Sequence, residues 1–199
     1  MDIKALAQKY EPYIIERRRY FHAHPELSFK EWETTKALVA EFEKMGMEIQ
    51  TFPDYPGLIA TLDTGKPGRT VMLRADIDAL PVKEGTGLDF ASQNEGVMHA
   101  CGHDNHMAML LGAAHILLEK KDELKGKVKF LLQSGEEMAC GAKYYVDHHI
   151  LDGVDAIFGQ HIWGTLDAPY VCVASGNRMA SCDLSLIHIS EPTRHLRIS

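Results

Sequence analysis

The chain has 199 residues, a formal net charge of −7 and 45% hydrophobic residues. These values are typical of a soluble globular protein of one domain or slightly more, whose core needs no disulfide or metal to form. The negative charge and the lack of a basic stripe argue against a nucleic-acid partner. No run reaches the ~18 apolar residues of a membrane span. With no secretion signal and no paired cysteine framework, we expect a cytoplasmic protein with reduced thiols.

Hydrophobic periodicity predicts two helices before the first strand. Residues 3–21 have apolar side chains at helical spacing, until Pro25 interrupts the pattern, and residues 32–45 repeat that spacing. Three strands are predicted next, at 47–52, 58–62 and 70–74. The near-continuous apolar run of the third strand suits a sheet that is covered on both faces.

Helices and strands alternate in the second half of the chain. They are predicted as a buried helix at 106–118, a strand at 128–133, a helix at 141–149 and a strand at 156–160. This alternation predicts an α/β fold with a doubly wound, mostly parallel sheet and helices on both faces. The pattern stops after Asp183. The tail 184–199 resembles a translated sequencing adapter, so we interpret it as non-native and exclude it.

Three of the predicted strands are followed by groups that bind metal ions or transfer protons. Asp76 and Asp78 follow the third strand, Glu136 and Glu137 follow the fourth, and His161 follows the fifth. In open parallel sheets the site lies outside the carboxyl ends of the strands, so we expect these groups to meet at one edge. Two adjacent acids can divide the work of a metallohydrolase. One binds the metal, and the other takes a proton from a water whose pKa the metal lowers to ~7.

The segment before the long helix adds sulfur and nitrogen ligands. Cys101 and His103 alternate along a predicted extended segment, so both side chains can face one side, and His106 lies one turn into the helix. Thiolate, imidazole and carboxylate together suit zinc, whereas imidazole with carboxylate also tolerates manganese or cobalt. This donor set predicts a metal site.

The remaining cysteines and several histidines have structural interpretations. The cysteines interpreted as small buried hydrophobes are Cys140, Cys172 and Cys182. His22 and His24 are interpreted as surface or loop histidines, although His24 can lie near the site. For His99, support of the site and plain packing are equally consistent with the sequence.

Four blocks, taken in order and spacing, resemble one family of amidohydrolases. They are RADIDALPVKE (74–84), SQNEGVMHACGHDNHMAMLLGAA (92–114), GEE (135–137) and FGQHIW (158–163). The stretch from about residue 10 to Asp183 is similar to the dinuclear metallopeptidases that include hippurate hydrolase, N-acyl-amino-acid amidohydrolases and auxin-conjugate hydrolases. MHACGHD is highly specific. Asn105 stands where the family has glycine and Glu95 where it has proline, and neither change removes a ligand.

The resemblance implies metal-dependent hydrolysis of the amide bond of N-acyl amino acids by a centre of two divalent ions. Zinc, manganese, cobalt and nickel all remain open. The positions that match family metal ligands are Cys101, His103, Glu137 and His161. Glu136 matches the general base. The side chains expected to support the ligands are Asp76, Asp78, Asp104 and His106.

Family members are roughly twice as long as this chain. The resemblance implies that a small α+β lid or dimerisation domain follows Met179–Asp183, and that the catalytic domain then resumes with one more ligand histidine. We therefore interpret 1–183 as the N-terminal part of the catalytic domain, inactive or nearly so as this fragment. The full-length form is expected to dimerise through the lid.

Two alternatives stay open at this point. One is a metal-binding relative without catalysis. The other is a cysteine hydrolase with Cys101 as nucleophile and His103 as base, although residues two apart on an extended chain are poorly placed for that pair. The acyl group and the amino acid stay undetermined, because the missing half builds most of the substrate pocket.

Overall fold

The computed structural model describes residues 2–167, 170–173 and 175–176. Residues up to Asp167 form one compact unit, and the described residues beyond it belong to a second unit and contain no helix or strand. Met179–Asp183 and the tail 184–199 lie outside the described residues. The domain boundary at 183 therefore stays a prediction.

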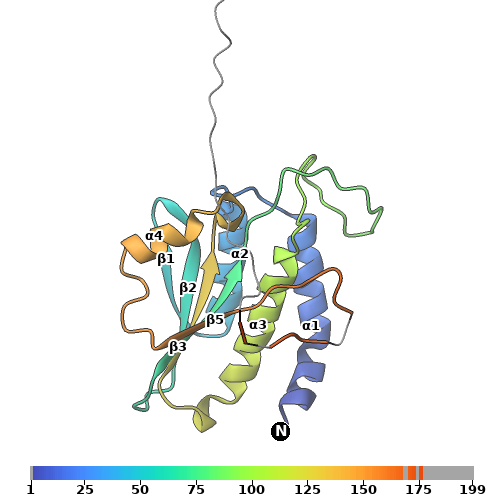
Figure 1. Cartoon of the computed structure of the whole chain (residues 1–199). Helices are drawn as coiled ribbons and strands as arrows, with labels where there is room; N and C mark the ends of the chain where they lie inside the picture. Colours follow the sequence, from blue (N-terminus) through green and yellow to red (C-terminus); the bar gives the residue numbers. More distant parts are fainter. Residues whose placement is uncertain (1, 168–169, 174, 177–199) are drawn as a thin grey trace, which may run out of the picture. The chain divides into compact units, whose positions relative to one another are not determined.

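A five-stranded sheet lies at the centre of the first unit, in the order β1-β2-β4-β3-β5 (Figure 1). The strands are β1 (Glu48–Phe52), β2 (Tyr55–Asp63), β3 (Thr70–Asp76), β4 (Lys127–Gln133) and β5 (Ala156–Gly159). β3 pairs in parallel with β4 and β5, whereas β2 pairs antiparallel with β1 and β4. Since β1 and β4 both oppose β2, four strands run in one direction, and two of the four pairings are parallel, so the sheet is mixed.

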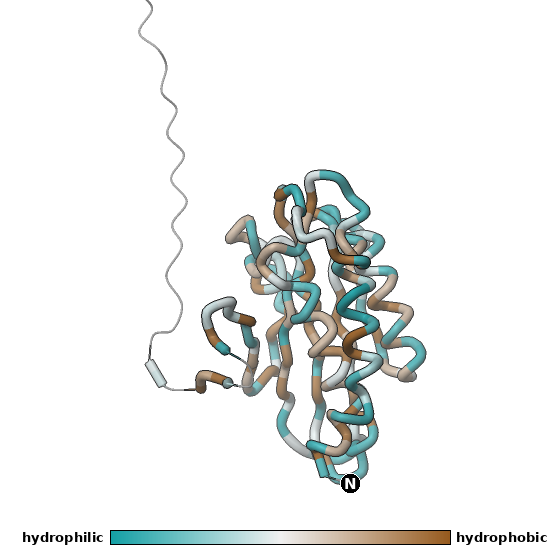
Figure 2. Tube along the Cα trace, turned by 90° about the vertical axis from the view of Figure 1, so that its right-hand side faces the viewer, coloured by the Kyte–Doolittle hydropathy of each residue, from teal (hydrophilic) through white to brown (hydrophobic). Residues whose placement is uncertain are grey.

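Helices cover both faces of this sheet, as predicted. The α-helices are α1 (Ile3–Ala23), α2 (Trp32–Lys44), α3 (His103–Glu119) and α4 (Gly141–Asp147). Neighbouring residues of a strand point to opposite faces. Leu132 of β4 therefore packs in the core beneath α2 and α3, while Leu131 packs against Tyr145 of α4. Figure 2 shows hydrophobic residues, in brown, along the strands between these layers.

None of the helices in the described part of the chain is both long and apolar enough to cross a membrane.

Some element ends differ from the predictions, because a backbone turn lies there. The helix predicted at 141–149 ends at Asp147, and His149 has a φ of 57° that no right-handed helix contains. β2 begins at Tyr55, three residues earlier than predicted, because a tight turn lets Phe52 pair with Tyr55.

Gly57 of β2 marks a close approach between the sheet and α4. Its φ is +103°, and a Cβ there would lie 2.5 Å from the Leu132 carbonyl oxygen and 2.5 Å from the Tyr145 hydroxyl. We expect Gly57→Ala to lower the free energy of unfolding by about 2–4 kcal/mol, because backbone strain adds to the overlap. Urea unfolding measures this change. The control is Gly65→Ala, with a φ of +71° in open space, and an equal loss in both variants would contradict the overlap.

Candidate metal centre

β3, β4 and β5 end at the same edge of the sheet. Asp76, the last residue of β3, lies opposite Gln133, the last residue of β4, while Gly159 ends β5 beside Arg74. Beyond β4 the chain enters a single 3₁₀ turn, η2 (Glu136–Met138), which carries both adjacent acids. Beyond β5 it reaches His161. The parallel pairing thus brings the three strand ends together, as the sequence predicts.

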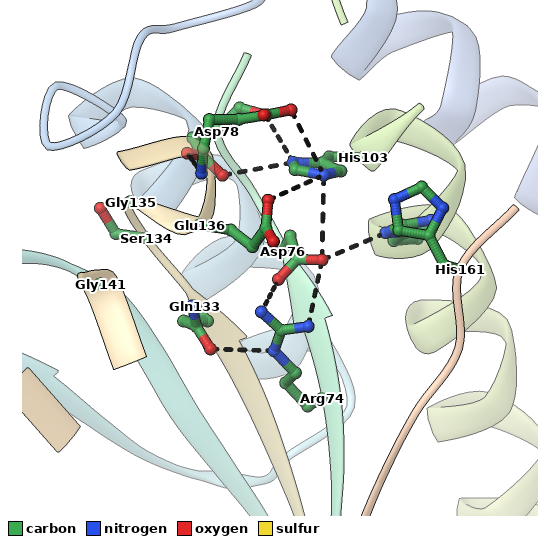
Figure 3. Close-up of polar contacts among 12 residues, drawn as sticks. Arg74, Asp76, Asp78, His103, Gln133, Ser134, Gly135, Glu136, Gly141 and His161 are labelled. Carbon is green, nitrogen blue, oxygen red and sulfur yellow. Dashed lines mark hydrogen bonds and ion pairs between the residues drawn. The ribbon is translucent and has the colours of Figure 1, made fainter. Parts of the chain in front are cut away.

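His103 lies at the centre of this cluster (Figure 3). Its ring is buried, and its Nε2 atom lies 3.8 Å from a carboxylate oxygen of each of Asp76, Glu136 and Glu137. Its Nδ1 atom lies 2.8 Å from the carbonyl oxygen of Asp78, to which it donates its proton. The lone pair of Nε2 therefore faces the carboxylates, and a histidine with a fixed tautomer of this kind is suited to bind a metal.

Cys101 and His161 form a second side of the cluster. The Cys101 Sγ atom lies 3.3 Å from Nε2 of His161, whose Nδ1 donates to the carbonyl of Ile162. Ligand atoms of Cys101, His103 and His161 lie within 4.8 Å of one another. Those of His103, Glu136 and Glu137 do so as well. The four predicted ligands and the predicted base therefore lie around His103. We call the space between their ligand atoms the shared volume.

The route of the chain through Cys101 and His103 differs from the predicted extended segment. Cys101 lies in a turn, Gly102 has a φ of +85°, and His103 is the first residue of α3. The left-handed φ favours glycine at this position, and a Cβ there would lie 2.2 Å from the Ile162 side chain, which would have to move. The prediction was wrong because no side chain caps this helix, which leaves its start without a sequence signal.

Asp78 orients two members of the cluster. Its Oδ1 lies 3.2 Å from His103 Nδ1, and its Oδ2 accepts hydrogen bonds from the Glu137 backbone N–H at 2.9 Å and the Ser28 hydroxyl at 2.7 Å. Burial alone raises its pKa, but the hydrogen bonds outweigh burial, so the net pKa is lowered. The ionised Asp78 therefore holds the proposed ligands in place without facing the shared volume itself.

Asp76 and His106, which are expected to support the ligands, lie beside His103. Arg74 Nη1 lies 3.2 Å from an Asp76 carboxylate oxygen, and His106 Nδ1 lies 3.5 Å from the same carboxylate. Ligand atoms of Asp76, His103 and His106 form a third group within 4.8 Å. His106 Nε2 accepts a hydrogen bond from the Ile162 backbone at 3.1 Å, which fixes the segment that carries His161. Distance alone does not separate these two residues from the ligands.

Asp104 connects the start of α3 to α1. Its Oδ2 lies 2.9 Å from Arg18 Nε and 2.8 Å from His22 Nδ1, and His22 Nε2 lies 3.1 Å from Glu84. His22 is only 3% exposed, so its interpretation as a surface or loop residue is wrong. Its acidic partners are 82 and 62 residues away in sequence, and a local pattern does not show such partners.

The structure also shows the burial of the other histidines and cysteines that the sequence analysis interpreted. His24 is exposed, and His99 is buried. Cys140 and Cys172 are exposed, which contradicts their interpretation as buried hydrophobes, and Cys182 lies outside the described residues. Cysteine burial is a statistical tendency, and these two positions follow a turn and an irregular segment rather than a core element.

The cluster gathers negative charge. Burial, followed by the charge of Asp76, raises the pKa of Glu136. Burial, followed by the charge of Glu137, raises the pKa of the Cys101 thiol to about 12. A cation in the shared volume would reverse both effects, because it favours the ionised carboxylate and the thiolate.

The residues present fit a divalent metal. Within the described part of the chain, the buried atoms His103 Nε2 and Glu137 Oε1 have no hydrogen-bond partner, and both face the shared volume. Buried polar atoms of this kind normally find a partner. The donor set of one thiol, imidazoles and carboxylates is the one that zinc and neighbouring transition metals prefer.

Sequence reasoning missed Glu31, the residue before α2. Its side chain is 0% exposed, and both of its carboxylate oxygens lie near the Ser134 hydroxyl, at 2.8 and 2.7 Å. Burial outweighs these hydrogen bonds and raises the pKa of Glu31 to about 7. A lone glutamate ahead of a helix usually reads as a solvated residue, and its partner lies 103 residues away in sequence.

The raised pKa of Glu31 predicts a pH-dependent stability. Its unperturbed pKa is 4.5. Between that value and about 7 the folded state binds the proton more tightly than the unfolded state, so the free energy of unfolding falls as pH rises. Glu31→Gln cannot ionise. We expect its stability relative to the wild type to rise by about 3 kcal/mol between pH 4 and pH 8, measured by urea unfolding. Parallel pH profiles would contradict the prediction.

Two curated relatives of this chain are named as an amidohydrolase and a deacetylase, and another, at 41% identity, is named thermostable carboxypeptidase 1 of Saccharolobus solfataricus. The N-acyl-L-amino acid amidohydrolase of Geobacillus stearothermophilus is 41% identical over 189 residues, which are 94% of this chain and 51% of that protein. The N-acetylcysteine deacetylase of Bacillus subtilis is 45% identical over 171 residues, which are 85% of this chain and 45% of that protein. The chain spans about half the length of the curated relatives it matches.

A solved structure and a family model also match this chain. The crystal structure of the Bacillus subtilis YxeP protein, a dinuclear metal-binding peptidase from the M20 family, matches with a TM-score of 0.75 and 44% identity, over 82% of this chain and 45% of that one. The model of peptidase family M20/M25/M40 matches residues 72–194, more than half of this chain, including part of the tail whose origin stays a prediction. The chain therefore belongs to peptidase family M20/M25/M40.

Proposed function

We propose that the full-length protein hydrolyses the amide bond of N-acyl amino acids in a metal-dependent reaction. One observation carries the proposal: His103 Nε2 lies 3.8 Å from carboxylate oxygens on two different strand ends. The thiol of Cys101 and the ring of His161 lie beside it. The names of the relatives at 41% and 45% identity support the substrate class.

We assign two divalent ions to this centre, drawn from Zn, Mn, Co and Ni. The side chains assigned to hold them are Cys101, His103, Glu137 and His161. When bound, such ions lower the pKa of a water and polarise the substrate carbonyl. Asp78 contributes by holding the tautomer of His103 and the backbone of Glu137. The rest of the full-length protein is expected to supply one more histidine.

Glu136 is the residue that we assign to proton transfer. Its side chain is 38% exposed, against 18% for Glu137, so it is the acid that a substrate can reach. A carboxylate beside the proposed ions can first take a proton from water and then return it to the leaving group. The proton passes from water to Glu136 and then to the leaving amine nitrogen. Hydroxide adds to the carbonyl carbon and the C–N bond breaks, which yields a carboxylic acid and a free amino acid.

The remaining proposals concern the whole protein. We infer that 1–183 is the N-terminal part of a catalytic domain, that this fragment alone has little activity, and that the full-length form dimerises through a lid domain after it. The exposed free thiols of Cys140 and Cys172 suit the reducing cytoplasm that we propose as its compartment. The partner is a small N-acyl amino acid.

Assays of the full-length protein against N-acetyl and N-benzoyl amino acids test the function. We expect release of the free amino acid together with two tightly bound divalent ions per chain, the latter measured by elemental analysis. Metal uptake without hydrolysis of any N-acyl amino acid would instead support the catalytically silent relative.

A further inference from the structure

The turn that carries Glu136 is held from one side by a buried carboxylate. Glu31 is completely buried, and its Oε1 accepts a hydrogen bond from the Gly135 backbone N–H at 3.1 Å. The Ser134 hydroxyl donates to the same carboxylate. Ser134 and Gly135 are the two residues between the end of β4 and the proposed base (Figure 3). Glu31 therefore joins the start of α2 directly to the turn of the candidate site.

A second buried carboxylate holds the other end of the same turn. The Glu137 backbone N–H donates to Asp78 at 2.9 Å, so the amides on both sides of Glu136 are fixed by acids from elsewhere in the chain. The turn also has no free space. Gly135 has a φ of +71°, and a Cβ there would lie 2.2 Å from the ring of Phe29.

Ionisation of the buried Glu31 carboxylate costs folding free energy instead of adding to it. A buried carboxylate that is paired only with neutral donors costs folding free energy. The raised pKa of Glu31, about 7, is consistent with that cost. What the carboxylate contributes is the position of the backbone at Ser134 and Gly135.

We propose that Glu31 is a positioning residue, which fixes the β4–η2 turn so that Glu136 faces His103. The inference rests on the proposed function insofar as it gives Glu136 the role of base. A displacement of about 1 Å in a catalytic group can lower turnover by about 100-fold. Removal of the Glu31 carboxylate is therefore expected to act on kcat and to leave the ions in place.

The test compares Glu31→Ala and Ser134→Ala with Glu41→Ala in the full-length protein. Glu41 is a matched control, because it is a glutamate of the same helix region and only 6% exposed, but its partners are Tyr13, Arg17 and Lys44. We expect Glu31→Ala to lower kcat about 100-fold, with KM changed less than about 3-fold. Ser134→Ala should lower kcat in the same direction. Glu31→Gln should recover most of the activity, since its amide oxygen still accepts the Gly135 N–H. Glu41→Ala should stay within about twofold of the wild type.

Hydrogen exchange of the segment 134–138 provides a readout that does not depend on activity. Faster exchange in Glu31→Ala and Ser134→Ala, but not in Glu41→Ala, is expected if the carboxylate holds the turn. If the wild type hydrolyses no N-acyl amino acid, the proposed function fails while this readout still decides the positioning. The inference is overturned if exchange in this segment is unchanged, or if Glu41→Ala lowers kcat as much as Glu31→Ala. Ser134→Ala decides the matter should Glu31→Ala not fold.

Discussion

Glu136→Gln in the full-length protein is expected to abolish most turnover while both ions stay bound. The glutamine has nearly the same shape but cannot take a proton, and positioned proton transfer typically contributes about 10²–10⁴-fold to rate. We therefore expect kcat to fall by that factor, measured with an N-acetyl amino acid at saturating concentration. Glu136 is not among the residues that we assign as ligands, so elemental analysis should find the metal content of the wild type.

Glu137→Gln is the matched control for this prediction. The two acids are adjacent in η2, and both lie 3.8 Å from His103 Nε2. Because Glu137 is the assigned ligand, its substitution should lower metal content as well as turnover. Near-normal turnover in Glu136→Gln would end its assignment as base, and metal loss in that variant with retention in Glu137→Gln would reverse the two roles.

Removal of the metal ions is expected to eliminate activity altogether, and added divalent ions should restore it. The alternative cysteine hydrolase predicts the opposite pattern, in which chelation has no effect and alkylation of Cys101 inactivates the loaded protein. A metal ion that holds the thiolate protects it from alkylation, so activity should survive the alkylating reagent until a chelator is added.

Other thiols would obscure this experiment. Cys140 and Cys172 are exposed and will react regardless of metal. The measurement therefore uses a variant with serine at Cys140, Cys172 and Cys182, and mass spectrometry follows the peptide that contains Cys101. Alkylation of Cys101 at the same rate with and without metal would remove this residue from the set of ligands.

The sequence predicted those parts of the site that depend on the direction of strands. Asp76 ends β3, Glu136 and His161 follow β4 and β5, and parallel pairing brings such residues to one edge. Strand direction does not place residues where the chain leaves the sheet. The left-handed turn at Gly102 has no periodic pattern, and the partners of Glu31 and His22 lie far away in sequence. Tertiary contacts that are set by packing, rather than by local pattern, were therefore found only in the structure.

The sharing of His103 among three groups of candidate ligands has a consequence for how the centre fills. The ring nitrogen that faces these groups has one lone pair, because the other nitrogen donates its proton to Asp78. A single lone pair serves a single ion. Two ions at this centre would therefore be inequivalent. His103 would bind one of them, and the other would depend on carboxylates, on the Cys101 sulfur and on side chains from the remainder of the full-length protein.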